Sequence, residues 1–210
     1  MSYRLESSFE LNIHVARLVE KLNKFNKYKK TLGEEKISNR KIEEIENAIQ
    51  TYGAETLLRS QTFVRYLFKE NFFLTTTFKN KSLKNLIVNG NVNYLEVFKK
   101  SPNVAFLQND KGWTIGHMLA ACDDFKPSKE NTPAYINIEK ILTYYAKNAN
   151  LATLTTDNGN TIGHLAATND LIYSYYNKNE TLRSMKNSMN LTIPAIREKY
   201  ETIKNQNNVK

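Results

Sequence analysis

The chain of 210 residues is poor in cysteine, glycine and proline and has no long apolar segment. A single cysteine excludes a disulfide scaffold and a cysteine-rich zinc or iron–sulfur site. No apolar run approaches the ~20 residues of a membrane-spanning helix, and the N-terminus lacks the basic-then-apolar layout of a secretory signal. With only 7 glycines and 4 prolines, an all-β fold rich in tight turns is disfavoured. We therefore expect an all-α, cytoplasmic protein.

Positive charge is in excess, with 30 Lys and Arg against 21 Asp and Glu, a net charge of +9. The excess is unevenly distributed along the chain. Residues 61–110 and 171–210 each carry +4, whereas residues 111–170 carry −1. The basicity is therefore a property of the flanks, and a partner recognised by charge alone would bind there.

The densest basic cluster spans residues 17–30. The simplest interpretation is a solvated helix face opposite a buried apolar stripe. The alternatives are a contact with the phosphate backbone of a nucleic acid and a contact with an anionic membrane. The membrane contact would be made through Lys21, Lys24 and Lys27.

Apolar residues spaced three and four apart predict three helices in the first third of the chain. The first covers about residues 8–30. The second begins after Ser38 as its cap and ends at Gly53, and the third covers about residues 54–70. We expect residues 1–72 to form a helical N-terminal module.

A self-comparison of the chain reveals an internal repeat. The segment D-K-G-W-T-I-G-H-M-L-A-A at residues 110–121 recurs as D-N-G-N-T-I-G-H-L-A-A at residues 157–167, an offset of 47 residues. A helix with a clear apolar face is predicted after the first copy, over residues 134–147. Fainter copies begin near Lys81 and Thr192.

These motifs resemble the ankyrin repeat, whose consensus reads D-x-x-G-x-T-P-L-H-x-A-A followed by a second helix. The resemblance implies an ankyrin-like helical solenoid over residues 73–210, capped by the N-terminal module. Its copies would cover about residues 75–108, 109–155 and 156–188, with a degenerate C-terminal cap at 189–205. The long spacing places an insertion near residues 122–133.

The resemblance assigns roles to individual residues. The glycine suits a turn that needs positive φ, the threonine caps a helix, and the histidine links backbone groups of adjacent turns. These structural residues are Gly112, Thr114, His117, Gly159, Thr161 and His164. Both copies read T-I-G-H where the family has T-P-L-H, and each added glycine is expected to cost helix stability, about 0.5–1 kcal/mol relative to alanine.

The family has no common enzymatic activity, so the resemblance implies non-catalytic binding of a protein partner through the concave face. The variable positions that would contact the partner are Lys111, Trp113, Met118, Asn158 and Asn160, with packing between repeats as the alternative for Met118. Trp113 is the sharpest candidate: its indole either anchors a partner, since tryptophan is favoured at interface hot spots, or covers a neighbouring repeat. Divergent ankyrin stacks on Lys- and Asn-rich chains also resemble effectors that intracellular bacteria deliver into the host cytoplasm.

Catalytic and metal sites are not indicated. His117 and His164 match the structural histidine of the repeat. Cys122 lacks the second histidine or carboxylate that would complete a catalytic arrangement, and the pair Asp123–Asp124 with His117 is a weak metal candidate. No phosphate-binding loop, nucleophile elbow or H-E-x-x-H motif is present. We expect no enzyme activity, no metal and no cofactor.

Overall fold

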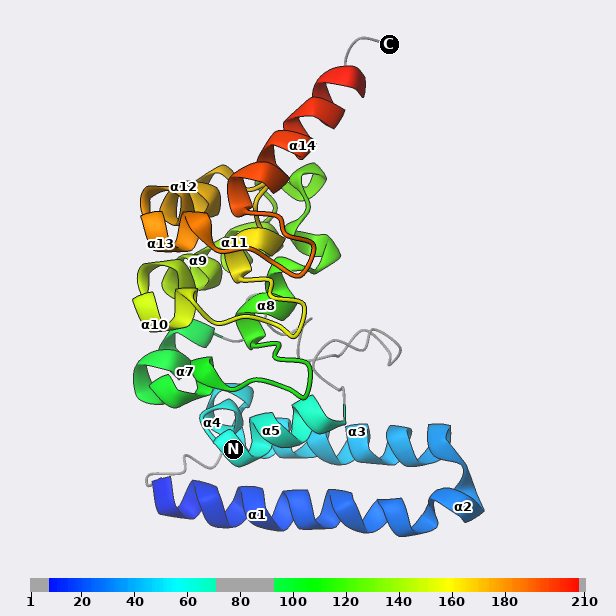
Figure 1. The fold of residues 1–210 in the computed structure, drawn as a ribbon. Helices are drawn as coiled ribbons and strands as arrows, with labels where there is room; N and C mark the ends of the chain where they lie inside the picture. The colour runs from blue at the N-terminus through cyan, green and yellow to red at the C-terminus, as the bar shows by residue number, and fades with distance from the viewer. Residues whose placement is uncertain (1–7, 71–92, 208–210) are drawn as a thin grey trace. The chain divides into compact units, whose positions relative to one another are not determined.

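The computed structural model describes residues 8–70 and 93–207, and all the regular elements of this part are helices (Figure 1). One isolated antiparallel bridge joins Lys186 and Thr192. The predicted all-α class is confirmed for these residues. They fall into two compact units, the first formed by residues 8–70 with 93–107 and the second by residues 108–207.

The first unit contains eight described helical segments. They are α1 (Ser8–Phe25), η1 (Asn26–Tyr28), α2 (Lys29–Leu32), α3 (Glu34–Tyr52), α4 (Ala54–Leu58), α5 (Gln61–Lys69), α7 (Tyr94–Lys100) and η2 (Pro102–Phe106). Helix α1 packs on α3 and α5, and α7 packs on α4. Of the predicted copy at 75–108, residues 75–92 lie outside the described residues, and its remainder corresponds to α7 and η2.

Three helix boundaries in the first unit differ from the predicted ones. The first helix ends at Phe25 and is followed by η1 and α2. Helix α3 begins directly after Gly33, which has φ 80°, and not after Ser38. The predicted third helix is two helices, because the extended backbone of Ser60 interrupts it. The apolar period alone does not reveal such a break.

The core of the described first unit is apolar except for the buried cation Lys41 and the buried hydroxyl group of Ser60. Leu11, Val15 and Leu22 of α1 are buried, which accounts for the apolar stripe read from the sequence. Lys41 on α3 is only 2% exposed, and its Nζ lies 2.5 Å from Oε2 of Glu70. Since a buried charge is costly without a partner, this ion pair is what permits a lysine in the core.

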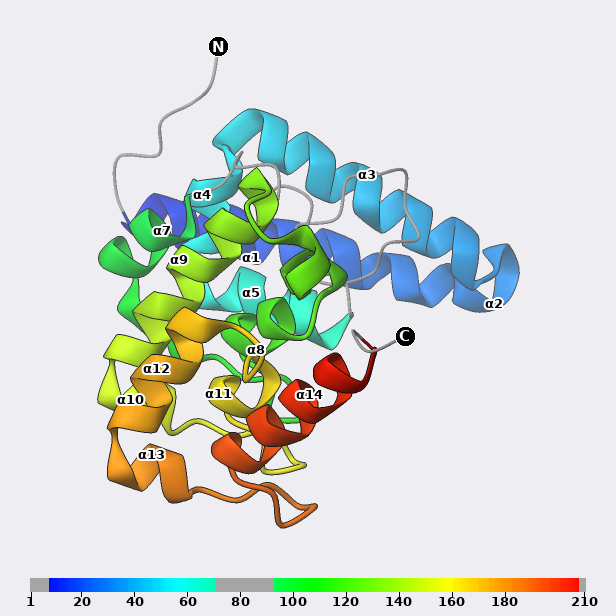
Figure 2. The same ribbon diagram turned by 90° about the horizontal axis from the view of Figure 1, so that it is seen from above.

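The second unit repeats one order of elements: a short helix, a longer helix and a single helical turn. The elements are α8 (Ile115–Ala120), η3 (Asp123–Phe125), η4 (Pro127–Lys129), α9 (Pro133–Lys147), α10 (Ala149–Ala152), α11 (Ile162–Leu165), α12 (Asp170–Lys178), α13 (Glu180–Ser184) and α14 (Ile193–Asn207). Helix α11 packs beside α8, and α12 packs beside α9 (Figures 1 and 2).

Side-chain caps explain why these short helices begin where they do. Thr132 caps α9 by accepting from the Tyr135 N–H, and Pro133 takes the first helical position, where its missing N–H costs nothing. Asn169 caps α12 in the same way. The start of α9 is one residue earlier than the predicted helix at 134–147.

The insertion near residues 122–133 is held against α9. It forms η3 and η4, and Phe125 is buried with its ring stacked on Tyr135, at 4.6 Å between centroids and 23° between planes. Aromatic stacking of this kind adds about 0.5–1.5 kcal/mol to simple burial. Within the described part of the chain, no helix is both long and apolar enough to cross a membrane.

Candidate functional site

Three turns of the second unit share one backbone geometry. In each five-residue turn the first N–H donates to the fifth carbonyl at 3.0 Å, and the fourth N–H donates to the first carbonyl at 2.8–3.0 Å. The turns are turn 1 (109–113), turn 2 (156–160) and turn 3 (187–191). Turn 3 precedes the fainter copy that begins near Thr192, and its backbone nevertheless has the same hydrogen bonds as turns 1 and 2.

The fourth residue of each turn has a positive φ. The angles are 73° at Gly112, 68° at Gly159 and 60° at Asn190. A Cβ on Gly112 would lie 2.9 Å from the Thr155 carbonyl oxygen, and one on Gly159 would lie 3.1 Å from Asn187 Cα. Glycine is therefore needed in turns 1 and 2 because the next turn is so close, as well as for φ.

A side chain at the first position of each turn stabilises it. Asn109 Oδ1 accepts from the N–H groups of Lys111 and Trp113, at 3.0 and 2.9 Å. Asn187 makes the same two bonds in turn 3. In turn 2, Thr156 Oγ1 accepts from the Asn160 N–H at 3.3 Å. In all three turns the stabilising side chain is therefore the residue before the second position, which is Asp110 in turn 1 and Asp157 in turn 2.

Adjacent turns are joined by the same backbone hydrogen bond. The N–H of Asp157 donates to the carbonyl of Lys111 at 3.0 Å, and the N–H of Ser188 donates to the carbonyl of Asn158 at 2.9 Å. Asn187 Nδ2 also donates to Asn160 Oδ1 at 2.9 Å. The three turns consequently form one hydrogen-bonded ladder, which holds their exposed side chains in a fixed row.

Threonine and histidine form reciprocal caps at the start of α8 and α11. The Thr114 side chain accepts from the His117 N–H at 3.3 Å, and His117 Nδ1 accepts from the Thr114 N–H at 3.3 Å. Thr161 and His164 repeat this arrangement. Each histidine thereby satisfies a backbone donor that a helix N-terminus otherwise leaves without a partner.

The other ring nitrogen of each histidine bonds to the backbone beside the next turn of the ladder. With Nδ1 acting as acceptor, Nε2 carries the proton, and in His117 it donates to the Leu154 carbonyl at 3.1 Å. His164 Nε2 lies 3.2 Å from the carbonyls of Met185 and Leu191. In the last copy the corresponding residue is Ala195, and no later copy follows it in the described residues. In both copies the histidine therefore ties a short helix to the backbone beside the next turn.

Burial keeps these imidazoles neutral. It lowers the pKa of His117 to about 4, and it lowers the pKa of His164 below its ordinary value. Both ring nitrogens of each histidine are already hydrogen-bonded, so neither is free to act as a general base or a metal ligand.

The two glycines of T-I-G-H allow tyrosines to pack against the short helices. A Cβ on Gly116 would lie 2.5 Å from Ile162 Cδ1 and 3.0 Å from the Tyr145 ring. A Cβ on Gly163 would lie 2.5 Å from the Tyr176 ring. Both tyrosines are fully buried, and burial raises their pKa well above the ordinary value. The glycines therefore offset their cost in helix propensity by close packing.

The residues predicted to contact a partner lie in three different environments. Lys111 and Asn158 are exposed at the third position of their turns. Trp113 is half-buried, with its ring edge-on to His117 at 6.4 Å between centroids. Asn160 is half-buried and bonded to turn 3. Met118 has to be removed from the set, because it is 4% exposed and packs in the interior of the unit.

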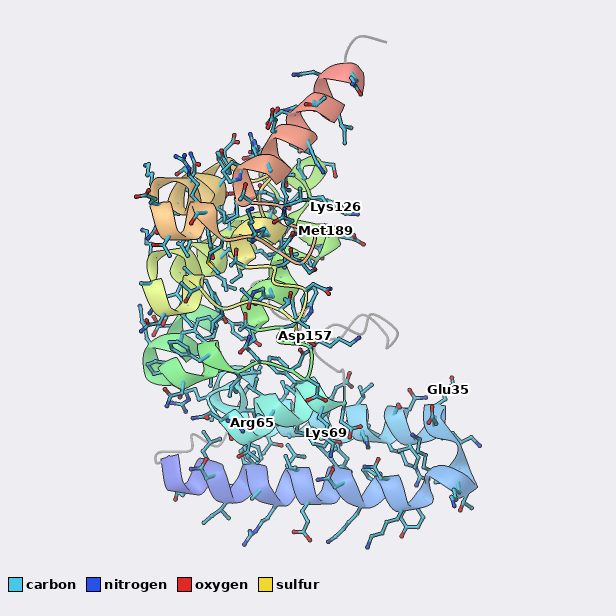
Figure 3. All side chains as sticks on the ribbon, in the orientation of Figure 1. Glu35, Arg65, Lys69, Lys126, Asp157 and Met189 are labelled. Carbon is cyan, nitrogen blue, oxygen red and sulfur yellow. The ribbon has the colours of Figure 1, made fainter. Side chains whose placement is uncertain are left out.

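One exposed residue of this row was not predicted. Met189, at the third position of turn 3, is 68% exposed and corresponds to Lys111 and Asn158. Figure 3 shows Met189 and Asp157 on the side of the second unit that carries the turns. We call the row Lys111, Asn158 and Met189, with the half-buried Trp113, the turn surface.

The basic cluster of α1 to α2 is partly neutralised within the first unit. Lys21 pairs with Glu44 at 2.7 Å, Lys24 with Glu20 at 2.8 Å, and Lys29 with Glu34 at 2.5 Å; Lys27 and Lys30 are exposed. Exposed pairs of this kind contribute little to stability. Binding of nucleic acid or an anionic membrane at this cluster stays a prediction.

The metal candidate gains no geometric support in the described residues, which contain no group of three or more His, Cys, Asp or Glu side chains placed to hold an ion. Asp123 pairs with Lys126 at 2.7 Å, and Cys122 is a half-buried thiol outside any disulfide.

No protein-family model matches the chain, and neither a search of the curated proteins nor a search of the solved structures found a match.

Proposed function

We propose that the second unit is a divergent ankyrin-like solenoid that recognises a protein partner, without catalysis, through the turn surface. The observation that carries this proposal is the ladder of turns: three turns of one geometry, joined by one repeated hydrogen bond. The backbone of such a row is already ordered before binding, so less of the contact energy is lost in ordering it and more appears as affinity.

The composition of the turn surface suits a protein partner. It combines an aromatic ring, a flexible thioether, an amide and a single cation at Trp113, Met189, Asn158 and Lys111. Tryptophan and methionine are enriched at protein interfaces, and the amide of Asn158 offers both a donor and an acceptor for directional hydrogen bonds. A nucleic-acid surface would instead be dominated by cations.

Both ends of the solenoid would need a polar cap. At the C-terminal end, Arg197 of α14 donates to the carbonyls of Ala167 and Thr168 and pairs with Asp170 at 2.6 Å. These bonds support a capping role for the start of α14. Residues 8–70 are proposed to cap the other end. The hypothesis of a bacterial effector acting in a host cytoplasm rests on the resemblance alone.

Substitution of the turn surface tests the proposed function. In an affinity capture from cytosol, Trp113→Ala and Lys111→Glu are expected to lose at least about tenfold of a partner that the wild-type chain retains, because they remove the anchor and reverse a contact charge. Lys111→Glu is expected to melt like the wild type, since Lys111 is exposed.

Lys178→Glu provides the matched control, since it reverses an exposed lysine at the end of α12, outside the turns. It is expected to retain the partner. If the two turn variants retain the same proteins as the wild type, the turn surface is not the binding site. If Lys111→Glu unfolds, its role is structural.

A further inference from the structure

Helix α14 carries an apolar stripe that its own unit covers only in part. Ile193, Ile196, Tyr200 and Ile203 are spaced three, four and three residues apart. Ile193 is fully buried, Ile196 and Tyr200 are half-buried, and Ile203 is 58% exposed. Figures 1 and 2 show the C-terminal half of α14 extending beyond α12 and α13. The stripe therefore continues past the surface that buries its beginning.

Charges border this stripe in a regular way. At about 100° per residue, Lys199 and Lys204 lie on its two opposite edges, and Glu198 lies on the far side of the helix. Both lysines are exposed, and neither forms an ion pair with another described residue. Arg197 and Glu201, by contrast, pair with each other at 2.6 Å. The exposed face is consequently apolar along its centre and cationic at both edges.

We propose that this face of α14 docks an acidic amphipathic helix of a partner protein. Spacings of three and four are those of the seam between two packed helices, and acidic side chains flanking the partner's own seam would pair with Lys199 and Lys204. The proposal concerns a second surface of the unit and stands independently of the turn surface.

Two other occupants fit the face less well. A second copy of α14 would bring lysines against lysines at the edges of the seam, which is repulsive. A membrane-surface helix sinks its apolar side about 5–10 Å into the lipid. Ile196 and Tyr200 are half-buried against the unit itself, so the unit would stop the apolar side of α14 from sinking to that depth.

A designed helical peptide tests the proposal with the complete 210-residue chain. The probe has about three heptads, with leucine at the seam positions and glutamate on both flanks, and the matched control peptide has lysine in place of glutamate. Fluorescence anisotropy at low ionic strength is expected to show saturable binding of the acidic peptide and much weaker binding of the basic one.

Variants of α14 sharpen this test. Ile203→Ser is expected to weaken binding of the acidic peptide about tenfold, because it removes the most exposed apolar contact. Lys199→Glu with Lys204→Glu is expected to abolish it and to create binding of the basic peptide. Lys178→Glu and Trp113→Ala leave binding unchanged. Melting curves check that each variant is folded.

Several results would overturn the proposal. They are the absence of saturable binding, equal binding of both peptides, and insensitivity to the lysine reversals. If Trp113→Ala loses binding, the peptide binds at the turn surface and not at α14. Association with phosphatidylserine-containing vesicles that Ile203→Ser abolishes, in the absence of peptide binding, would assign the face to a membrane.

Discussion

Gly163→Ala is expected to destabilise the protein by about 2–3 kcal/mol, the cost of overpacking a rigid interior. The added Cβ would lie 2.5 Å from the Tyr176 ring and 2.7 Å from Ile193 Cδ1. Neither neighbour can move easily, since both side chains are fully buried. Urea unfolding of the variant and the wild type measures the difference.

The sign of this effect is diagnostic. Helix propensity alone predicts that alanine stabilises a helical glycine position by about 1 kcal/mol. Combining Gly163→Ala with Tyr176→Leu makes room for the Cβ, so the double variant is expected to be more stable than the sum of the single changes predicts. A stabilising Gly163→Ala, or strictly additive effects, would contradict the proposed packing.

His117→Leu is expected to cost about 3 kcal/mol, because it keeps an apolar side chain of similar size but breaks two buried hydrogen bonds. The Thr114 N–H loses its acceptor and the Leu154 carbonyl loses its donor. Ala195→His places the same ring at the corresponding position of the last copy. This control is expected to change stability by less than about 0.5 kcal/mol, because Ala195 is only half-buried and the described residues contain no later turn to which the ring could bond.

The same histidine makes stability depend on pH. An unfolded histidine binds a proton near pH 6.5, whereas folded His117 binds one only near pH 4, so protons favour the unfolded chain between these values. Above pH 7 His117 is neutral in both states, and the free energy of unfolding is expected to have its highest value. At pH 5 the contribution of His117 alone is expected to lower it by about 2 kcal/mol. In His117→Leu the fall in the free energy of unfolding between pH 7 and pH 5 is expected to be smaller by this amount. An identical pH dependence in the variant would contradict the assigned role.

The sequence predicts the class of the fold and the repeated cap well, because both depend on local patterns. Apolar residues three and four apart identify α1 and α9, and T-I-G-H marks the two caps made by Thr114 and Thr161. The self-comparison of the sequence did not find turn 3, because Asn190 stands where the other two turns have glycine. Asparagine nevertheless tolerates a positive φ better than most residues.

Other features depend on contacts between distant residues. The reason for glycine in T-I-G-H is the bulk of Tyr145 and Tyr176, which lie well downstream in the chain. Met118 was assigned to a binding groove by its place in the motif, and its burial follows from packing that the motif does not encode. Met189 could have been found by aligning its turn with the first two, since it shares their third position.

The most direct test of protein recognition by the turn surface is amide hydrogen exchange of the captured complex against the free chain. Amides that a partner covers exchange more slowly. Recognition through the turn surface predicts new protection in residues 109–113, 156–160 and 187–191, with the exposed side of α1 unchanged. Protection confined to α1 or to the C-terminal half of α14, with all three turns exchanging as in the free chain, would contradict it.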